Sequence, residues 1–286
     1  MTIGYSSALL HWLEQEGYGS IASAFPQGGG SINESSILTT NSGQQFFLKQ
    51  NTNAPQEMFA IEARSLTMIA ASRSLPVPEP YYWDGHCLLM ELVLPGTKSD
   101  SYWEQFGEQL ATMHQHTRDV FELEFQTYCG TTLQANGQMA DGHQFFAENR
   151  LLAVGEMALN GGLLNQKDRD ALERLCRRLP SLVPTQPASL IHGDLWSGNA
   201  HTSPTGHPVL IDPALYFGWR EADIAMTQLF GGFPEAFYQS YQAAWPMEKD
   251  WLQRSEIYNL FHLLNHLNLF GSGYLSQTRA IIAKYS

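Results

Sequence analysis

One short segment constrains the fold and the chemistry of this chain more than any other. After Ile191 the sequence reads His-Gly-Asp-Leu-Trp-Ser-Gly-Asn, and the apolar run 209–211 then ends at Asp212. Phosphoryl transfer needs a carboxylate that orients the attacking hydroxyl and oxygen ligands that hold Mg²⁺. Catalytic loops for this chemistry carry an Asp and an Asn five positions apart, as Asp194 and Asn199 are here. In such loops a metal-binding Asp follows the next strand, where this chain has Asp212. A turn capped by Gly, Asp and Asn is the alternative, but two further signals in the expected order favour a phosphoryl-transfer centre.

The first of these signals is a lysine inside a predicted buried strand. Lys49 ends the run Phe-Phe-Leu-Lys at 46–49, and on the next predicted helix Glu62 shares a face with apolar neighbours, namely Phe59, Leu66 and Ile69. Each charge would be costly to bury alone, so we expect the two to pair. Such a pair aims the lysine ammonium at the α- and β-phosphates of ATP. The alternative is that both side chains reach solvent.

The second signal is a glycine-rich segment that precedes Lys49. Adjacent glycines let backbone N–H groups approach phosphate oxygens without a Cβ in the way. Taken alone the segment fits a plain loop, and it is neither a Walker loop nor a GxGxxG fingerprint. Its position before Lys49 predicts a phosphate loop formed by Gly28, Gly29, Gly30 and Ser31.

A third segment, 89–93, resembles the connection between the lobes of a kinase. Backbone groups of Glu91 and Leu92 could pair with adenine there, and Met90 would border the adenine pocket. A plain buried strand explains the segment equally well.

Strand and helix signals are unevenly distributed along the chain. The early part predicts a helix at 5–16, a hairpin over 36–50 turning at Asn-Ser-Gly, a helix from Asn53 to 72 and a strand at 87–93. The later part predicts mostly helices, at 102–117, 143–159, 167–179 (ended by Pro180) and beyond 221, with short strands at 188–192 and 209–211. We therefore expect an α+β fold with two lobes: a small antiparallel-sheet lobe with one major helix at 1–94, and a larger, mainly helical lobe at 95–286.

Composition excludes several classes of partner. Apolar residues make up 43% of the 286 residues, so the chain is globular. The net charge is −12 and no Lys/Arg run occurs, which argues against nucleic acid or an anionic membrane as partner. The start has no apolar signal core, and no apolar run approaches the roughly 18 residues of a membrane span. We expect a cytoplasmic protein.

Two sets of metal-binding residue types are interpreted as structural. Cys87, Cys129 and Cys176 lack metal spacing and are expected to be reduced packing residues. His262 and His266 lie four apart on a predicted helix, but a leucine stands where a zinc protease would carry its glutamate.

Three segments of the chain closely resemble those of a known family. The catalytic segment, 209–233 and 259–271 resemble the fructosamine kinase (ketosamine-3-kinase) family, which has a protein-kinase-like fold related to aminoglycoside and choline kinases. The Leu-Trp-Ser-Gly insert and the Arg-Glu-Ala-Asp continuation at 220–223 narrow the resemblance to this family. It implies an ATP- and Mg²⁺-dependent kinase that phosphorylates the sugar C3 hydroxyl of free or protein-bound ketosamines, after which the unstable adduct leaves the amine.

The resemblance also implies roles for particular residues. Asp194 corresponds to the catalytic base, Asn199 and Asp212 to the Mg²⁺ ligands, and Lys49 and Glu62 to the phosphate-positioning pair. Candidates for contact with the sugar are Trp196, Trp219 and Glu221.

Two qualifications belong with these roles. Trp196 could instead fill the base of the loop, and we expect Asp223 to hold that loop by hydrogen bonds. Some family members carry a cysteine in the phosphate loop, whereas Ser31 and Ile32 stand here. We therefore expect no redox control at that loop.

Two alternatives to a ketosamine kinase remain. An aminoglycoside- or choline-type kinase would share the general catalytic pattern, but the tryptophan-containing loop argues against it. A catalytically idle nucleotide-binding protein is the other, and the presence of Asp194, Asn199, Asp212 and Lys49 together argues against that.

Overall fold

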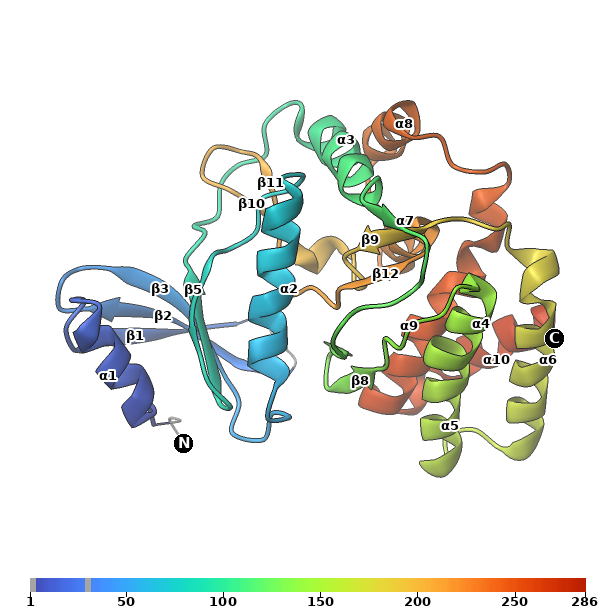
Figure 1. The fold of residues 1–286 in the computed structure, drawn as a ribbon, viewed down its shortest axis with the longest axis horizontal. Coiled ribbons are helices and arrows are strands. Elements are labelled where there is room, and N and C mark those ends of the chain that lie inside the picture. The colour runs from blue at the N-terminus through green and yellow to red at the C-terminus, as the bar shows by residue number, and fades with distance from the viewer. Residues whose placement is uncertain (1–3, 29–31) are drawn as a thin grey trace. The chain divides into compact units, whose positions relative to one another are not determined.

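A computed structural model of the chain describes residues 4–28 and 32–286 (Figure 1). Gly29, Gly30 and Ser31 of the predicted phosphate loop lie outside the described residues. The chain divides into two compact units, one made of Met1–Tyr102 with His201–Asp212 and the other of Trp103–Ala200 with Pro213–Ser286. The predicted lobes at 1–94 and 95–286 stay a prediction.

The first unit is built on a five-stranded antiparallel sheet in the order β1-β2-β3-β5-β4. Its strands are β1 (Ile21–Gln27), β2 (Glu34–Thr40), β3 (Gln45–Gln50), β4 (Pro80–Trp83) and β5 (Cys87–Glu91). The predicted hairpin joins β2 to β3, where Gly43 has φ +87° and its N–H bonds to the Thr40 carbonyl at 2.9 Å. A left-handed φ of this kind is accessible to glycine at little cost, which explains the Asn-Ser-Gly turn.

Successive residues along a strand pack against two different helices. Helix α1 (Ser7–Gln15) covers a cluster that includes Leu48 and Leu89, and helix α2 (Met58–Ser72) covers a cluster that includes Leu88 and Met90 (Figure 1). Successive strand residues point to opposite faces. The alternation that buries Leu48 under α1 therefore turns Lys49 toward α2.

Helix α2 begins later than its sequence suggests. We predicted a start near Asn53, but the helix begins at Met58. The Asn51 side chain accepts a hydrogen bond from the Asn53 N–H at 2.9 Å, which holds this stretch in a turn rather than a helix. A two-stranded hairpin of β10 (Ala200–Thr202) and β11 (Pro208–Leu210) also belongs to this unit, apart from Ala200.

The second unit is mainly helical. Its helices are α3 (Tyr102–His114), α4 (Gly142–Phe146), α5 (Ala153–Asn160), α6 (Gln166–Leu182), α7 (Arg220–Leu229), α8 (Glu235–Ala244), α9 (Ser255–Phe270) and α10 (Leu275–Tyr285). A π-helical segment, Ala147–Leu152, links α4 to α5, and 3-10 turns occur at Ser197–Asn199, Trp251–Arg254 and Ser272–Tyr274. Helix α6 continues past Pro180 to Leu182, so the prediction that the proline ends it is wrong. Near a helix C-terminus the proline removes one backbone hydrogen bond without stopping the last turn.

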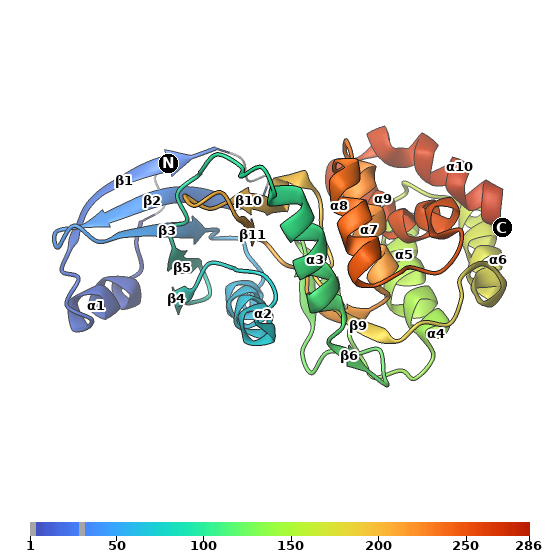
Figure 2. The same ribbon diagram turned by 90° about the horizontal axis from the view of Figure 1, so that it is seen from above.

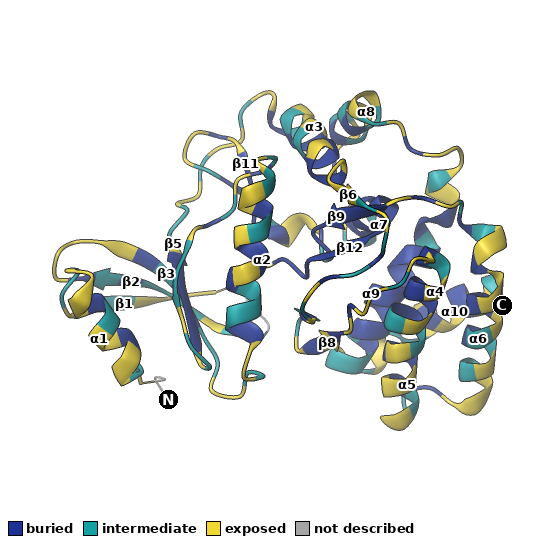
Figure 3. Ribbon diagram, in the orientation of Figure 1, coloured by how far each residue is buried: buried dark blue, intermediate teal, exposed yellow. Residues whose placement is uncertain are grey.

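Short strands in this unit position the loop at 192–199, which follows β9 directly. Strands β12 (Tyr216–Gly218), β9 (Ala188–Ile191) and β6 (Thr117–Arg118) form one sheet, and β7 (Thr127–Cys129) pairs with β8 (Thr132–Gln134). Helix α9 is buried along most of its length, whereas α6 keeps an exposed face (Figure 3). Figure 2 shows α7 beside α9, and these two helices pack extensively on one another. Within the described ranges, none of the helices combines the length and the apolar character that a membrane span requires.

Candidate active site

In the first unit a buried lysine is held between two carboxylates. Lys49 on β3 donates to Glu62 Oε1 on α2 at 2.5 Å and also to Asp212 Oδ1. Its side chain is 7% exposed and that of Glu62 is 11% exposed. Burial alone would lower the pKa of Lys49, but the charges of Asp212 and Glu62 raise it, so the ammonium stays charged. The predicted Lys49–Glu62 ion pair is confirmed, and Asp212 joins it as a partner that sequence reasoning did not place there.

Asp212 combines an unusual backbone with an open side chain. It follows β11 and has φ +56°, in the left-handed region that few residues other than glycine adopt. Aspartate tolerates this conformation better than most residues, at a cost of roughly 1–2 kcal/mol. Its side chain is 47% exposed even though one oxygen contacts Lys49. A carboxylate that is fixed at one oxygen and still open to solvent suits a hard-cation ligand.

In the second unit the predicted catalytic loop follows β9 through a tight bend. Gly193 has φ +82°, and a Cβ placed there would lie 2.1 Å from the Ala214 carbonyl oxygen. Only glycine fits this approach. Asp223 on α7 accepts hydrogen bonds from the N–H groups of His192 (2.6 Å) and Gly193 (2.8 Å). The prediction that Asp223 holds the loop by hydrogen bonds is confirmed.

The Asp223 carboxylate belongs to a buried polar chain. His114 Nε2 lies 3.1 Å from Asp223 Oδ2, and Tyr241 Oη lies 2.8 Å from His114 Nδ1. Burial alone would raise the pKa of Asp223, but His114 and the loop N–H groups hold it below its usual value. Burial lowers the pKa of His114, so the ring is neutral. These contacts fit Tyr241 donating to Nδ1 while Nε2–H donates to the carboxylate.

Asn199 braces Asp194 within the same loop. The Asn199 amide nitrogen donates to the Asp194 carbonyl at 2.8 Å and to its Oδ2 at 3.3 Å. Because the amide nitrogen faces Asp194, the amide oxygen is the atom of Asn199 suited to a cation. Asp212 belongs to the other unit, so the convergence of Asp194, Asn199 and Asp212 on one metal site stays a prediction.

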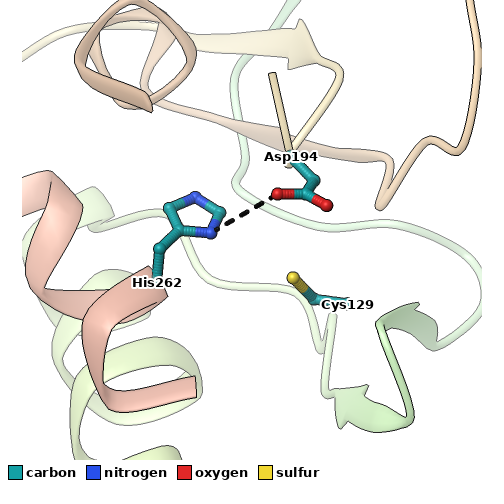
Figure 4. A group of neighbouring side chains, drawn as sticks. All are labelled: Cys129, Asp194 and His262. Atoms are coloured by element: carbon teal, nitrogen blue, oxygen red, sulfur yellow. Dashed lines mark ion pairs between the residues drawn. The ribbon is translucent and has the colours of Figure 1, made fainter. Parts of the chain in front are cut away.

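Two side chains that we took to be structural lie next to Asp194. His262 Nδ1 on α9 is 3.8 Å from Asp194 Oδ1, and the Cys129 thiol at the end of β7 faces the same space (Figure 4). Burial lowers the pKa of His262 to about 3, so its ring is neutral at physiological pH. The signal available in the sequence was the pair His262 and His266, four residues apart on an otherwise apolar helix, and we interpreted both histidines as structural.

The three candidate sugar contacts differ in accessibility. Trp196 is 37% exposed, and its ring lies over Gly198 and edge-on to Phe230, with centroids 6.1 Å apart. Trp219 is buried among aromatic rings, and a Cβ on Gly142 would touch its indole nitrogen. A sugar could therefore reach Trp196 but not Trp219.

Glu221 is also inaccessible. Its carboxylate accepts two hydrogen bonds from Arg254, both at 2.7 Å, and one from the Tyr258 hydroxyl at 2.9 Å. The residue is 1% exposed. Because Arg254 and Tyr258 occupy its carboxylate, Glu221 stabilises the packing of α7 on the segment before α9. The predictions that Glu221 and Trp219 contact the sugar are therefore wrong for this structure, since both side chains are buried.

The predicted nucleotide-binding segments each lie at the C-terminal end of a strand, β1 for Gly28 and β5 for residues 91–92. Met90 is buried against α2, and Glu91 is exposed at the end of β5. Residues 91–94 line one wall of a pocket of about 260 Å³ whose other walls include Pro76 and Val209. Gly28 is exposed just after β1, and a Cβ added to it would have no heavy atom of the described residues within 4 Å. Adenine and phosphate binding by these residues stays a prediction.

The fold and these residues define a kinase-like phosphotransferase. The fructosamine kinase family model matches residues 6–286, and the chain belongs to this family. It is 38% identical to a probable ketoamine kinase of Synechocystis sp., over 89% of this chain and 87% of that protein. It is 35% identical to a chloroplastic protein-ribulosamine 3-kinase of Arabidopsis thaliana, over 90% and 81%.

Solved structures agree with this assignment. The crystal structure of a putative fructosamine-3-kinase from Thermobifida fusca is 30% identical and superposes with a TM-score of 0.87, covering 98% of both chains. An aminoglycoside phosphotransferase, 14% identical with a TM-score of 0.63 over 97% and 98% of the chains, shares the fold alone. The predicted family, the protein-kinase-like α+β fold and the enzyme class, an ATP-dependent kinase that acts on a hydroxyl, are confirmed.

Proposed function

We propose that this protein transfers the γ-phosphoryl group of ATP to the C3 hydroxyl of a ketosamine, a sugar-derived ketoamine on a small amine or a protein. The names of its relatives, ketoamine kinase and protein-ribulosamine 3-kinase, support this substrate class. The phosphorylated adduct then loses its sugar and frees the amine. The activity is therefore one of deglycation.

One observation carries the choice of an active catalyst over an idle binding protein. Lys49 keeps both carboxylate partners, and the loop that carries Asp194 and Asn199 is braced by a buried Asp223. An idle nucleotide-binding protein would have no use for both arrangements. The buried charges of the Lys49 cluster are costly to keep without a function.

In the proposed mechanism Asp194 orients the sugar hydroxyl and accepts its proton late. The O3–phosphorus bond forms in line as the bond between phosphorus and the β-phosphate oxygen breaks, and ADP leaves. Lys49, aimed by Glu62, neutralises charge on the phosphates, and the loop at Gly28–Ser31 adds backbone N–H groups. In this assignment residues 1–94 hold the nucleotide and 95–286 carry the catalytic loop.

The donor atoms of Asn199 and Asp212 suit Mg²⁺. An amide oxygen and a half-exposed carboxylate are hard oxygen ligands of the kind that Mg²⁺ prefers. When bound, Mg²⁺ would offset negative charge on the phosphates. Neither a thiol nor an imidazole takes part in this set.

Product mapping tests the proposal. The protein is incubated with ATP, Mg²⁺ and, in parallel, a ribulosamine, a fructosamine, an aminoglycoside and choline, and the products are examined by ³¹P and ¹³C NMR. We expect a phosphate ester on the C3 oxygen of at least one ketoamine. Transfer only to the aminoglycoside or to choline would favour the other kinase class. Nucleotide binding without consumption of ATP on any acceptor would favour the idle protein.

A further inference from the structure

A cluster of three side chains in the second unit has the composition of a zinc site. We propose that Cys129, Asp194 and His262 bind a thiophilic divalent cation such as Zn²⁺, and that the bound cation inhibits phosphoryl transfer. Binding needs only these three residues. The inhibition also rests on the proposed role of Asp194 as catalytic base.

The geometry places one ligand atom from each residue around a common space. Cys129 ends β7, Asp194 lies in the loop after β9 and His262 lies on α9, so three separate elements supply the ligands. The sulfur, a carboxylate oxygen and an imidazole nitrogen lie within 4.8 Å of one another, and all point inward (Figure 4). Tetrahedral zinc with bonds of about 2.0–2.3 Å sets its ligand atoms roughly 3.3–3.8 Å apart. His262 Nδ1 and Asp194 Oδ1 already lie 3.8 Å apart, so closure needs small side-chain movements.

A second observation points to a ligand at this position. His262 is 4% exposed, and its Nδ1, which faces the cluster, makes no hydrogen bond to any described residue. A buried polar atom left without a hydrogen bond costs about 1–3 kcal/mol. Burial also keeps the ring neutral, which is the form of histidine that binds metals. A metal ion would give this nitrogen a partner.

The donor set selects the kind of cation. Thiolate and imidazole favour zinc and similar soft or borderline ions over Mg²⁺, which prefers oxygen ligands. Burial raises the pKa of the Cys129 thiol, so binding breaks its S–H bond, forms a metal–sulfur bond and releases one proton to solvent. The thiolate and the Asp194 carboxylate together balance the two positive charges of the ion. The Arg150 guanidinium, buried nearby, further favours the thiolate.

Binding at this site would remove the catalytic base. The carboxylate oxygen that faces His262 would become a metal ligand, and Asp194 could no longer accept the proton of the sugar hydroxyl. Three protein ligands leave one position on a tetrahedral ion for water or a substrate oxygen. The predicted consequence is reversible inhibition that Mg²⁺ does not relieve, because Mg²⁺ competes poorly for a thiolate.

Cobalt spectroscopy tests binding without any substrate. Metal-free protein is kept reduced with a phosphine, which avoids competing thiols, and titrated with Co²⁺. We expect a thiolate-to-cobalt charge-transfer band in the near ultraviolet that saturates at one ion per chain. Cys129→Ala and His262→Ala should each lose the band, whereas Cys176→Ala, which removes another buried thiol of the same unit, should keep it. Absence of the band in the wild-type protein, or its persistence in Cys129→Ala, would overturn the proposal.

A kinase assay then tests the consequence. With Mg-ATP and a ketoamine at saturation, we expect Zn²⁺ to inhibit the wild-type protein and Cys176→Ala alike. Cys129→Ala should keep its basal turnover and need at least about tenfold more Zn²⁺ for half-inhibition, since even outer-shell changes cost metal sites about 10–100-fold in affinity. Equal sensitivity of both variants would show that Zn²⁺ acts elsewhere. If no ketoamine is phosphorylated, the substrate assignment fails, but the cobalt titration still decides whether the site exists.

Discussion

The two units hold their reactive groups in different ways. In the first, Lys49 is fixed by side-chain charges, one on α2 and one after β11. In the second, Asp194 is fixed indirectly, because a buried carboxylate, Asp223, holds the backbone N–H groups of the loop that carries it. Ion pairs between side chains can exchange partners when phosphates or a cation arrive. Backbone hydrogen bonds to a buried carboxylate hold one geometry before any ligand binds.

Lys49 therefore belongs to an adjustable part of the enzyme, and the loop that carries Asp194 belongs to a preset part. Lys49 can give up its contact with Asp212 to a phosphate while Glu62 keeps it aimed. The loop has no such freedom, because Gly193 already lies against the Ala214 carbonyl and Asp223 holds both neighbouring N–H groups. Substitutions in the preset part should therefore affect both stability and turnover, and those in the adjustable part mainly turnover.

The largest effect is expected at the base itself. Asp194→Asn should reduce turnover by about 10²- to 10⁴-fold, the usual contribution of a positioned general base. The amide keeps the shape of the side chain, and the nucleotide is held by other groups, so ATP affinity should stay close to that of the wild type. Single-turnover rates and nucleotide titration measure the two quantities. A variant that keeps wild-type turnover would remove Asp194 from the mechanism.

Lys49→Met tests the adjustable part. The change removes one charge that stabilises the transferring phosphoryl group, and the expected fall in turnover is about 10²- to 10³-fold. Burial already raises the pKa of Glu62, so this carboxyl can take up a proton when Lys49 is gone. We therefore expect cooperative unfolding at a temperature close to that of the wild type. A large loss of stability with intact turnover would contradict the expectation that substitutions at Lys49 affect mainly turnover.

Asp223→Asn tests the preset part. An amide cannot accept from all the donors that face Asp223, so we expect a loss of about 2 kcal/mol of unfolding free energy and up to about 10²-fold in turnover as the loop shifts.

The pH dependence of this loss has a definite sign. The pKa of Asp223 is lower in the folded protein than in the unfolded chain. The carboxylate therefore contributes stability that is fully present at pH above its unfolded-state pKa of about 3.9, and this stability is lost as the pH falls through its lower folded-state pKa. The gap in stability between wild type and variant, measured by denaturant titration, should be full at pH 7 and should shrink below about pH 4. A gap that does not change with pH would show that the lost charge is not the cause.

Glu62→Gln should have a smaller effect than Lys49→Met. Lys49 keeps its contact with Asp212, and the amide oxygen of glutamine can still accept a hydrogen bond. Loss of a charged hydrogen bond of about 1.5 kcal/mol corresponds to a fall of about tenfold in turnover. Steady-state kinetics at saturating ATP measures it. A loss as large as that of Lys49→Met would mean that Glu62 acts directly on the reacting groups.

Local signals predicted most of the fold and several parts of the site. Alternation along β3 and helical spacing on α2 predicted that Lys49 and Glu62 would meet, because both periods follow from backbone geometry. The start of α2 was not predictable from propensity, since the Asn51 side chain favours a competing turn. The role of Asp212 as a partner of Lys49 depends on contacts between distant segments, which no local pattern encodes.

Burial was the main source of error at the site. Trp219 and Glu221 follow the predicted metal-binding Asp and were candidate sugar contacts, yet both lie in the interior, unlike the half-exposed Trp196. Asp223 bonds to the catalytic loop, whereas Glu221 bonds to Arg254. His262 was set aside for want of a glutamate beside it, but its partner Asp194 comes from another element.

The smallest effect on turnover is expected at Glu221. Glu221→Gln leaves the buried Arg254 without its carboxylate partner, so unfolding free energy should fall by about 3 kcal/mol, as for other broken buried pairs. The carboxylate is enclosed by Arg254 and Tyr258 and cannot reach a sugar, so kcat and KM for the ketoamine should be unchanged at a temperature where the variant is folded. Arg254→Lys, which retains the charge but not the two-point contact, is the matched control and should lose less stability. An increased KM in Glu221→Gln with normal stability would restore this residue as a sugar contact, and would mean that the segment before α9 opens when substrate binds.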